Sequence, residues 1–303
     1  MSDSIDSIVR HSPSSGPGSA DVWGIYEADT GSIQYICACP ETRKAALIDV
    51  VWNFDPKSFA TSTRSMDEVL ALAARHDLKI EKILDTHPHA DHLMASRQLK
   101  ERLGVPNGIG AKVREIAELW RDYYNTPDAF DVDRDFDHLF EDGDRFGIGA
   151  LDLRVMLSPG HTLGSITYVC GDAAFVHDTL MMPDTGTSRA DFPGGSTAEL
   201  WDSIQAILSL PRETRLFIGH DYGSESRDAP AWEATVAEHR AENKHVRDGT
   251  KKADYIAVRD ARDATLPLPD RMLAALQINL RAGALPEAES DGRHYLKLPV
   301  NRF

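Results

Sequence analysis

The chain carries Thr86-His87-Pro88-His89-Ala90-Asp91-His92, which places three histidines and an aspartate in one short stretch. In an extended segment, side chains two positions apart point to the same face, so His87, His89 and Asp91 can converge. His92 is expected to open the following helix and to reach the same point from another side. Imidazole and carboxylate ligands together suit zinc, iron or manganese. The stretch therefore predicts a metal site at the end of a strand.

Three later residues each follow a short apolar run and are candidates for the same site. A strand fixes the position of a ligand at its end, while the adjoining loop leaves room for a substrate. Taken alone, each would more often be an ordinary loop or core residue, but their order after the histidine-rich stretch favours a shared site. They are His161 in Ser158-Pro159-Gly160-His161-Thr162, Asp178 after Ala174-Phe175-Val176-His177, and His220 after Leu216-Phe217-Ile218-Gly219.

Length and composition limit the class of protein. The 303 residues are 42% hydrophobic, which allows one large domain or two small ones. A formal net charge of −15 repels phosphate backbones, so we expect no nucleic-acid partner. No stretch approaches the roughly 20 apolar residues of a membrane span, and three cysteines do not suggest a disulfide framework. We therefore expect a cytoplasmic protein with no membrane partner; a homodimer stays open.

Two successive β-rich halves, each with helices, predict an α/β sandwich of two mixed sheets face to face with helices on both outer sides. Residues 1–20 are expected to be a flexible lead-in, followed by a catalytic domain over 21–303 that includes a C-terminal extension from about residue 231. Helices are predicted from a capping box of Ser65 and Glu68, from Asp91 to Gly104, and over 198–208. Strands are predicted over 32–39, 44–51, 80–84, 151–157, 165–169, 173–176 and 215–218.

The order of these motifs from about Val22 to His220 resembles the metallo-β-lactamase superfamily. That resemblance implies an αββα sandwich and a centre that can hold two metal ions. One ion would use His87, His89 and His161; the second would use Asp91, His92 and His220, with Asp178 able to bridge.

Two short stretches resemble one branch of that superfamily, the persulfide dioxygenases (sulfur dioxygenases). Residues 185–192, ending in Arg189-Ala190-Asp191-Phe192, are similar to their Gly-x-x-Arg-x-Asp-Phe segment, and His220-Asp221-Tyr222 is similar to their His-Asp-Tyr. This resemblance implies one Fe²⁺ per chain, held by His87, His161 and Asp178. It also implies oxidation of glutathione persulfide, or another small persulfide, by O₂ to sulfite and thiol.

The remaining residues of the cluster have two interpretations. His89, Asp91, His92 and His220 would orient the ligands of a single iron. The same residues would instead complete a Zn²⁺ pair in a hydrolase of glutathione thioesters, the glyoxalase II type, and ligand count does not decide between the two. A non-catalytic interaction module is disfavoured because no ligand is missing.

Outside the metal ligands, the arginine segment and the last motif supply candidate functional residues. Arg189 offers a planar fork to a glutathione carboxylate or to Asp191. Tyr222 can present its hydroxyl to the substrate or the metal. We therefore take Arg189, Asp191 and Tyr222 as candidate substrate contacts, and Asp91, His220 and Tyr222 as candidate catalytic groups.

Overall fold

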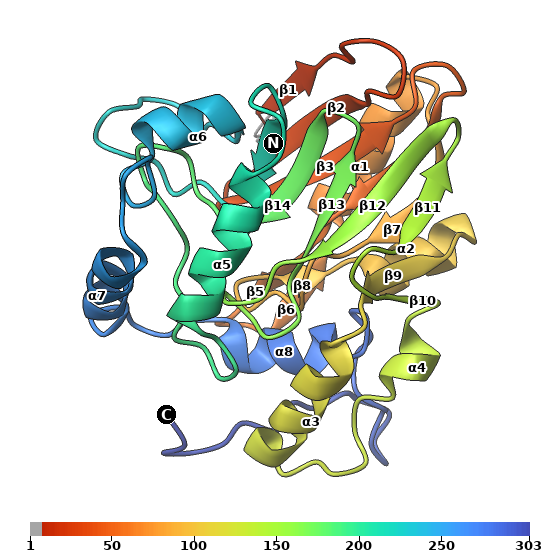
Figure 1. Ribbon diagram of the computed structural model, residues 1–303. Coiled ribbons are helices and arrows are strands. Elements are labelled where there is room, and N and C mark those ends of the chain that lie inside the picture. The colour runs from red at the N-terminus through yellow and green to blue at the C-terminus, as the bar shows by residue number, and fades with distance from the viewer. Residues whose placement is uncertain (1–7) are drawn as a thin grey trace.

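Two β-sheets packed face to face form the centre of the computed structural model, which describes residues 8–303 (Figure 1). Over that range the first sheet has seven strands, antiparallel from β1 to β4 and parallel from β4 to β10. In spatial order they are β1 (Val9–Ser12), β2 (Asp21–Glu27), β3 (Ser32–Ala38), β4 (Lys44–Ile48), β7 (Lys79–Leu84), β9 (Asn107–Gly110) and β10 (His138–Phe140).

The second sheet is formed by later strands and is also mixed, because only β14 and β15 run parallel. Its strands in spatial order are β11 (Arg145–Ile148), β12 (Leu151–Leu157), β13 (Ile166–Cys170), β14 (Ala173–His177), β15 (Arg215–Ile218) and β16 (Glu233–Thr235). A small third sheet joins β6 (Ala60–Ser62), β5 (Val51–Asp55) and β8 (Leu93–Met94).

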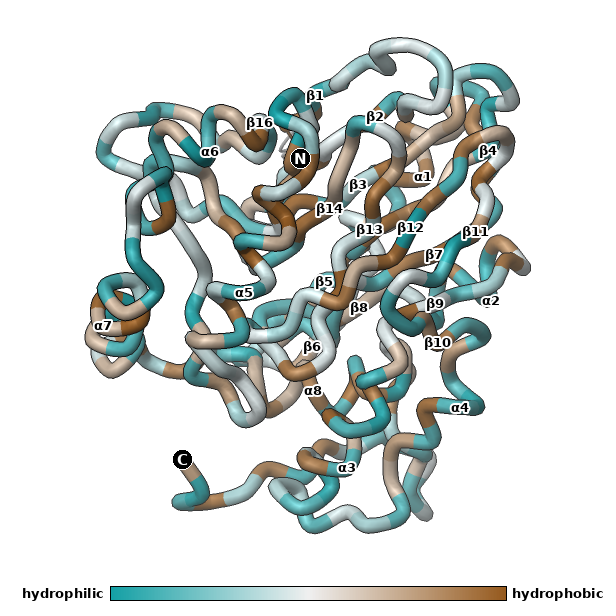
Figure 2. Tube along the Cα trace, viewed as in Figure 1, coloured by the Kyte–Doolittle hydropathy of each residue, from teal (hydrophilic) through white to brown (hydrophobic). Residues whose placement is uncertain are grey.

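Aromatic and aliphatic side chains from the two inner faces form the core. In β12, Leu151, Leu153 and Val155 alternate with more exposed residues, as expected for a strand with one buried face. Across the sheets, the ring of Tyr35 meets the edge of Phe175 at a centroid distance of 5.4 Å. Figure 2 shows hydrophobic segments concentrated on the central strands and hydrophilic segments on the surrounding loops.

Helices cover both outer faces, which confirms the predicted αββα arrangement. Side chains of α1 (Arg64–Arg75) and α2 (Ser96–Leu103) pack with the outer side of the first sheet, and those of α5 (Thr197–Leu208) pack on the second. The other helices are α3 (Val113–Tyr124), α4 (Val132–Asp135), α6 (Val236–Glu242), α7 (Lys252–Asp263) and α8 (Met272–Asn279). Figure 1 places α6 and α7 beyond α5, and α8 beneath the sheets beside α3.

Several local expectations were wrong. Residues 9–12 form β1 and pair with β2, instead of belonging to a flexible lead-in, while residues 1–7 lie outside the described residues. Helix α1 begins after Thr63, so Ser65 lies inside it and its hydroxyl accepts from Asn53 instead of capping. The helix expected from Asp91 begins only at Ser96, because Leu93–Met94 pairs with β5.

Other expectations agree with the structure. Gly104 ends α2 with φ of 68°, a left-handed conformation that suits glycine. The three cysteines are free and buried. Among residues 8–303, no helix is long and apolar enough to cross a membrane.

Candidate metal centre

The seven residues predicted as ligands lie together at one end of the sandwich, where strands of both sheets finish. Four of them follow β7 of the first sheet, and the other three follow β12, β14 and β15 of the second. They divide into two groups, and within each group the ligand atoms lie within 4.8 Å of one another. The first group is His87, His161 and Asp178, and the second is His89, Asp91, His92 and His220.

The first group directs its ligand atoms to one point. Nε2 of His87 lies 3.7 Å from Oδ2 of Asp178, and Nε2 of His161 lies 3.6 Å from the same oxygen. These separations are too long for hydrogen bonds. Two atoms that each bind one ion at about 2.1 Å stand roughly 3 to 3.5 Å apart, so the spacing is close to that of metal ligands.

Partners outside the group determine which ring nitrogen of each histidine is free. Nδ1 of His161 lies 2.8 Å from the carbonyl oxygen of Arg189, which can only accept, so Nδ1 carries the proton. Nδ1 of His87 lies 3.0 Å from the Thr86 hydroxyl, which donates its own proton to Asp49 at 2.8 Å. Both rings therefore present an unprotonated Nε2 to the centre of the group.

The backbone near the ligands has an unusual conformation at His177 and requires glycine at two positions of the motifs. His177, at the end of β14, has φ of 41°, a conformation uncommon for non-glycine residues, and the register between β14 and β15 shifts there. A Cβ at Gly219 would lie 2.6 Å from Oδ1 of Asp178, so a side chain there would displace the carboxylate. Gly160 has φ of 129°, and its Cβ would lie 2.2 Å from the backbone nitrogen of Leu200.

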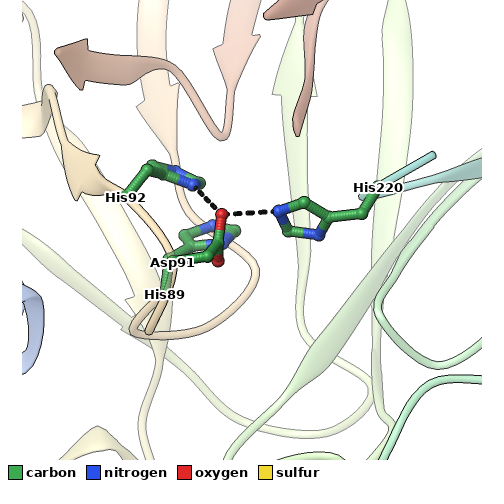
Figure 3. Close-up of side chains that lie close together, drawn as sticks. All are labelled: His89, Asp91, His92 and His220. Carbon is green, nitrogen blue, oxygen red and sulfur yellow. Dashed lines mark hydrogen bonds and ion pairs between the residues drawn. The ribbon is translucent and has the colours of Figure 1, made fainter. Parts of the chain in front are cut away.

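The second group is linked by shorter contacts, as Figure 3 shows. Oδ2 of Asp91 lies 2.7 Å from Nε2 of His220 and 2.9 Å from Nδ1 of His92. His220 also joins the two groups, because its Nδ1 lies 2.6 Å from Oδ1 of Asp178. His89 faces Asp49, with Nε2 3.1 Å from Oδ1. These are distances of hydrogen bonds and ion pairs.

Burial and neighbouring charges give the two groups different protonation. Burial, reinforced by neighbouring histidines, holds the pKa of His87 well below its usual value, so the ring is neutral. Burial opposes charge on Asp178, but His220 outweighs it and keeps the pKa of the carboxyl below its ordinary range. Although burial opposes this too, Asp178 and Asp91 raise the pKa of His220 well above its usual value. A neutral imidazole and an ionised carboxylate are the forms that bind metals.

Two supporting residues from the first sheet were not singled out from the sequence. Ser32, at the start of β3, places its hydroxyl 3.0 Å from Nε2 of His220. Asp49, directly after β4, accepts from the backbone and the hydroxyl of Thr86 at 2.8 Å each and faces His89. Asp49 adopts a φ of 52°, which is uncommon for a residue other than glycine. This backbone conformation beside the candidate site is the structural feature that points to Asp49 as a supporting residue.

Asn279, the last residue of α8, supports the histidine-rich loop from the C-terminal region. Its Nδ2 donates to the carbonyl oxygens of His89 at 2.7 Å and His92 at 2.8 Å. Its Oδ1 accepts from the backbone nitrogen of Met94 at 2.8 Å. The side chain is fully buried. One residue near the end of the chain therefore holds the loop that supplies four candidate ligands.

Arg189 is engaged by its neighbours. Its guanidinium forms a bidentate pair with Asp191, at 2.6 and 2.7 Å, and donates to the carbonyl oxygen of Pro267 at 2.7 Å. It also lies 4.7 Å from the ring centroid of Phe192. Of the two partners expected for this arginine, the structure shows Asp191; a contact with the substrate stays a prediction.

Tyr222 lies next to the centre but faces solvent. Its ring stacks on His220 with a centroid distance of 5.7 Å and an interplanar angle of 12°, and the residue is 69% exposed. Its roles in catalysis and substrate binding stay predictions.

An apolar hollow lies beside His161. Its walls come from the histidine-rich loop, from α3 and α8, and from the segment after Arg189. Among its lining residues are Pro88, Ala90, Trp120, Leu163, Phe192 and Leu276. The hollow measures only about 20 Å³, so it forms an apolar wall beside the first group and does not enclose a ligand.

The donor atoms fit a divalent transition metal. Nε2 of His87 and Nε2 of His92 are buried without a hydrogen-bond partner among the described residues. A buried polar atom without a partner costs about 1–3 kcal/mol, and binding an ion would remove that cost. Two histidines and one carboxylate that leave other positions open are typical of non-haem iron sites, and the same donor types also suit zinc.

The fold is a sandwich of two mixed sheets, and buried histidines and aspartates lie together where its strands end. This combination is typical of a metal-binding enzyme. The chain belongs to the metallo-β-lactamase superfamily, whose family model matches residues 36–220. This confirms the family predicted from the order of the motifs.

Similar proteins agree with the assignment. The chain is 53% identical over 280 residues to a "beta-lactamase hydrolase-like protein" of Xylella fastidiosa, covering 92% of this chain but only 64% of that relative, less than two thirds of its length. It is 43% identical to a "probable metallo-hydrolase" of Burkholderia pseudomallei, covering 92% of this chain and 99% of the relative. The crystal structure of ETHE1 from Myxococcus xanthus has a TM-score of 0.68 and 28% identity, covering 86% of this chain and 98% of that one.

Proposed function

We propose that this protein is an iron-dependent persulfide dioxygenase that oxidises glutathione persulfide, or a similar small persulfide, with O₂. The observation that carries the proposal is the contrast between the two groups of the centre. His87, His161 and Asp178 have the spacing of ligands around one ion, whereas Asp91 contacts both His92 and His220 at hydrogen-bond distances. One ion per chain is the arrangement that this contrast favours.

The proposed reaction consumes one persulfide, one O₂ and one water, and yields one thiol, one sulfite and two protons. The terminal sulfur of the persulfide loses four electrons as its bond to the inner sulfur breaks, and O₂ gains the same four electrons. A bound ferrous ion would supply this redox chemistry and attract the persulfide thiolate.

The chain's own residues would bind the ion, orient the groups that hold it and shield the site from water. His87, His161 and Asp178 would hold the ion. His220 donates to Oδ1 of Asp178 at 2.6 Å, which leaves Oδ2 for the ion. The apolar residues beside His161 would line one side of the substrate and limit the access of water. Tyr222 is exposed and stacks on His220, so it is a candidate to assist the reaction from the solvent side.

Hydrolysis of glutathione thioesters at a Zn²⁺ pair is the second candidate function. The second group offers four donors within 4.8 Å, and this observation favours it. In such an enzyme the second group would hold one of two metal ions, and the metal pair would supply the activation of water for hydrolysis. The names of the Xylella and Burkholderia relatives also refer to hydrolases.

Both activities can be measured on one preparation of the wild-type chain loaded with a single equivalent of Fe²⁺ under argon. We expect O₂ uptake and sulfite formation with glutathione persulfide, and little hydrolysis of S-lactoylglutathione. Asp178→Ala, which removes a ligand, should lose O₂ uptake, whereas His138→Ala, an exposed histidine of β10, should behave as wild type. Rapid thioester hydrolysis without O₂ uptake would replace the proposal with the hydrolase.

A further inference from the structure

We propose that Ser32 keeps Asp91, His92 and His220 in a hydrogen-bonded arrangement and thereby limits the protein to one tightly bound metal ion. The inference deepens the proposed function and rests on it, because a single ion per chain is what that function requires. Ser32 is the first residue of β3, and its position comes from pairing with Glu27 of β2 and from a bridge to His220. The serine is 1% exposed, so water does not compete for its hydroxyl.

The hydroxyl of Ser32 contacts one carboxylate oxygen of the second group and the two ring nitrogens that contact that oxygen. Its oxygen lies 3.1 Å from Oδ2 of Asp91, 3.1 Å from Nδ1 of His92 and 3.0 Å from Nε2 of His220. Ligands held at about 2.1 Å by one ion would stand roughly 3 to 3.5 Å apart, whereas Asp91 is within 2.7 and 2.9 Å of the two rings. The group is therefore contracted around hydrogen bonds, with the serine hydroxyl at its centre.

The proton of the Ser32 hydroxyl goes to a neighbouring oxygen atom and not to a histidine. Thr30 Oγ1 donates to a carboxylate oxygen of Glu27 at 2.8 Å, which uses the only proton of that hydroxyl. The single proton of Ser32 therefore goes to one of two oxygen atoms, Oγ1 of Thr30 at 2.7 Å or Oδ2 of Asp91 at 3.1 Å. With either acceptor, no serine proton is left for the two histidines.

The serine oxygen then has only lone pairs to offer to the two imidazoles. Nδ1 of His92 and Nε2 of His220 must donate to it or to Asp91, so both nitrogens carry protons in this arrangement. A ring nitrogen that carries a proton has no lone pair for a metal. His92 still offers its unpartnered Nε2, but both ring nitrogens of His220 are engaged, Nδ1 with Asp178 and Nε2 with Asp91 and Ser32. For a second ion to bind to His220 these hydrogen bonds must break, and Ser32 stabilises them.

Zinc binding to the metal-free protein tests this role without relying on enzyme activity. The protein is stripped with a chelator and titrated with Zn²⁺ against a chromophoric competitor, and the two stepwise affinities are fitted. Wild type should bind one ion tightly and a second far more weakly. Ser32→Ala and Ser32→Gly should bind the second ion about 10-fold tighter or more, with little change in the first.

Ser158→Ala is the matched control, because Ser158 is equally buried and contacts a histidine, His177 Nε2 at 3.2 Å, that is outside the second group. It should leave the second affinity unchanged. A second affinity that stays the same or falls in both Ser32 variants would overturn the inference, and so would two equally tight sites in wild type. Failure of O₂ uptake in iron-loaded wild type would instead remove the dioxygenase assignment and leave these affinities to be judged separately.

Discussion

Neighbouring histidines of one motif have different tasks. The rings of His87 and His89 lie side by side, with centroids 4.2 Å apart, as expected for residues two positions apart in an extended segment. Nε2 of His87 nevertheless points to Asp178, whereas Nε2 of His89 points to Asp49. The partner of each ring, more than its place in the motif, decides whether it is a ligand of the first group.

This difference predicts opposite results for two single variants. His161→Ala removes one of three ligands, so metal content and O₂ uptake should both fall to background. His89→Ala should lower activity by about 10–100-fold while most of the metal stays bound, because it removes an orienting group and not a ligand. Metal analysis of the purified variants beside wild type measures both effects. Loss of the metal in His89→Ala would make His89 a direct ligand.

The sequence predicts the ligands better than their supports. The seven candidate ligands stand out because histidine and aspartate follow apolar strands in a recognisable order. Ser32, Asp49 and Asn279 carry no such pattern; each is an ordinary polar residue until the sheet pairing or α8 brings it to the centre. Contacts between residues so distant along the chain, such as Asn279 and His89, leave no local signal.

At the scale of elements, a helix predicted from local spacing was wrong where a distant strand pairs with the same residues. Residues 91–104 have helical spacing, yet Leu93 and Met94 form β8 because Trp52 and Val51 of β5 pair with them. The pairing keeps His92 in the loop and delays α2 to Ser96. By contrast, β12 and β15 lie where they were predicted, because each is an apolar run bounded by turn residues.

Helix α8 is expected to control metal affinity through Asn279. Asn279→Ala removes two buried hydrogen bonds to the histidine-rich loop and one to Met94 of β8, which should cost about 2–4 kcal/mol of stability and weaken metal binding about 10-fold or more. Urea unfolding and zinc competition measure the two quantities.

Gln277→Ala on the same helix is the matched control. Gln277 forms hydrogen bonds to the backbone of Leu273 and Lys297, and among the described residues it has none to the loop. It should lose stability but keep wild-type metal affinity. Equal losses of affinity in both variants would show that α8 acts only through general stability.

At the scale of the whole molecule, the C-terminal region packs against the segment that carries Arg189. His245 Nδ1 accepts from the backbone nitrogen of Thr187 at 3.1 Å, and Arg259 donates to the carbonyl oxygen of Thr187 at 3.0 Å. Asp263 accepts from the backbone nitrogen of Ala190 at 2.8 Å. Because the carbonyl oxygen of Arg189 holds His161, these contacts connect the C-terminal helices to a metal ligand.

This packing should weaken in mild acid. Burial lowers the pKa of His239 to about 4, and burial with Arg259 and Lys244 lowers that of His245 to about 4, against an ordinary value of 6.5. The unfolded chain therefore takes up protons first, so stability is complete above about pH 6.5 and is lost as the pH falls towards 4. For fully buried His239 the loss is on the order of 3 kcal/mol.

Urea unfolding of the metal-free protein between pH 7.5 and pH 4.5 measures this dependence, and metal-free protein avoids the release of ligands in acid. His239→Gln cannot gain the charge and should reduce the pH dependence, while other buried histidines such as His87 and His245 keep their share of it. An unchanged slope in this variant would show that other groups cause the acid sensitivity.

The number and position of metal ions in active protein test the central claim most directly. Anomalous scattering from crystals of protein purified without added metal, measured at the iron and zinc edges, gives both. We predict one iron per chain, bound by Nε2 of His87, Nε2 of His161 and Oδ2 of Asp178, with Asp91, His92 and His220 free of metal. Two zinc ions per chain, one of them bound by Asp91, His92 and His220, would contradict the account.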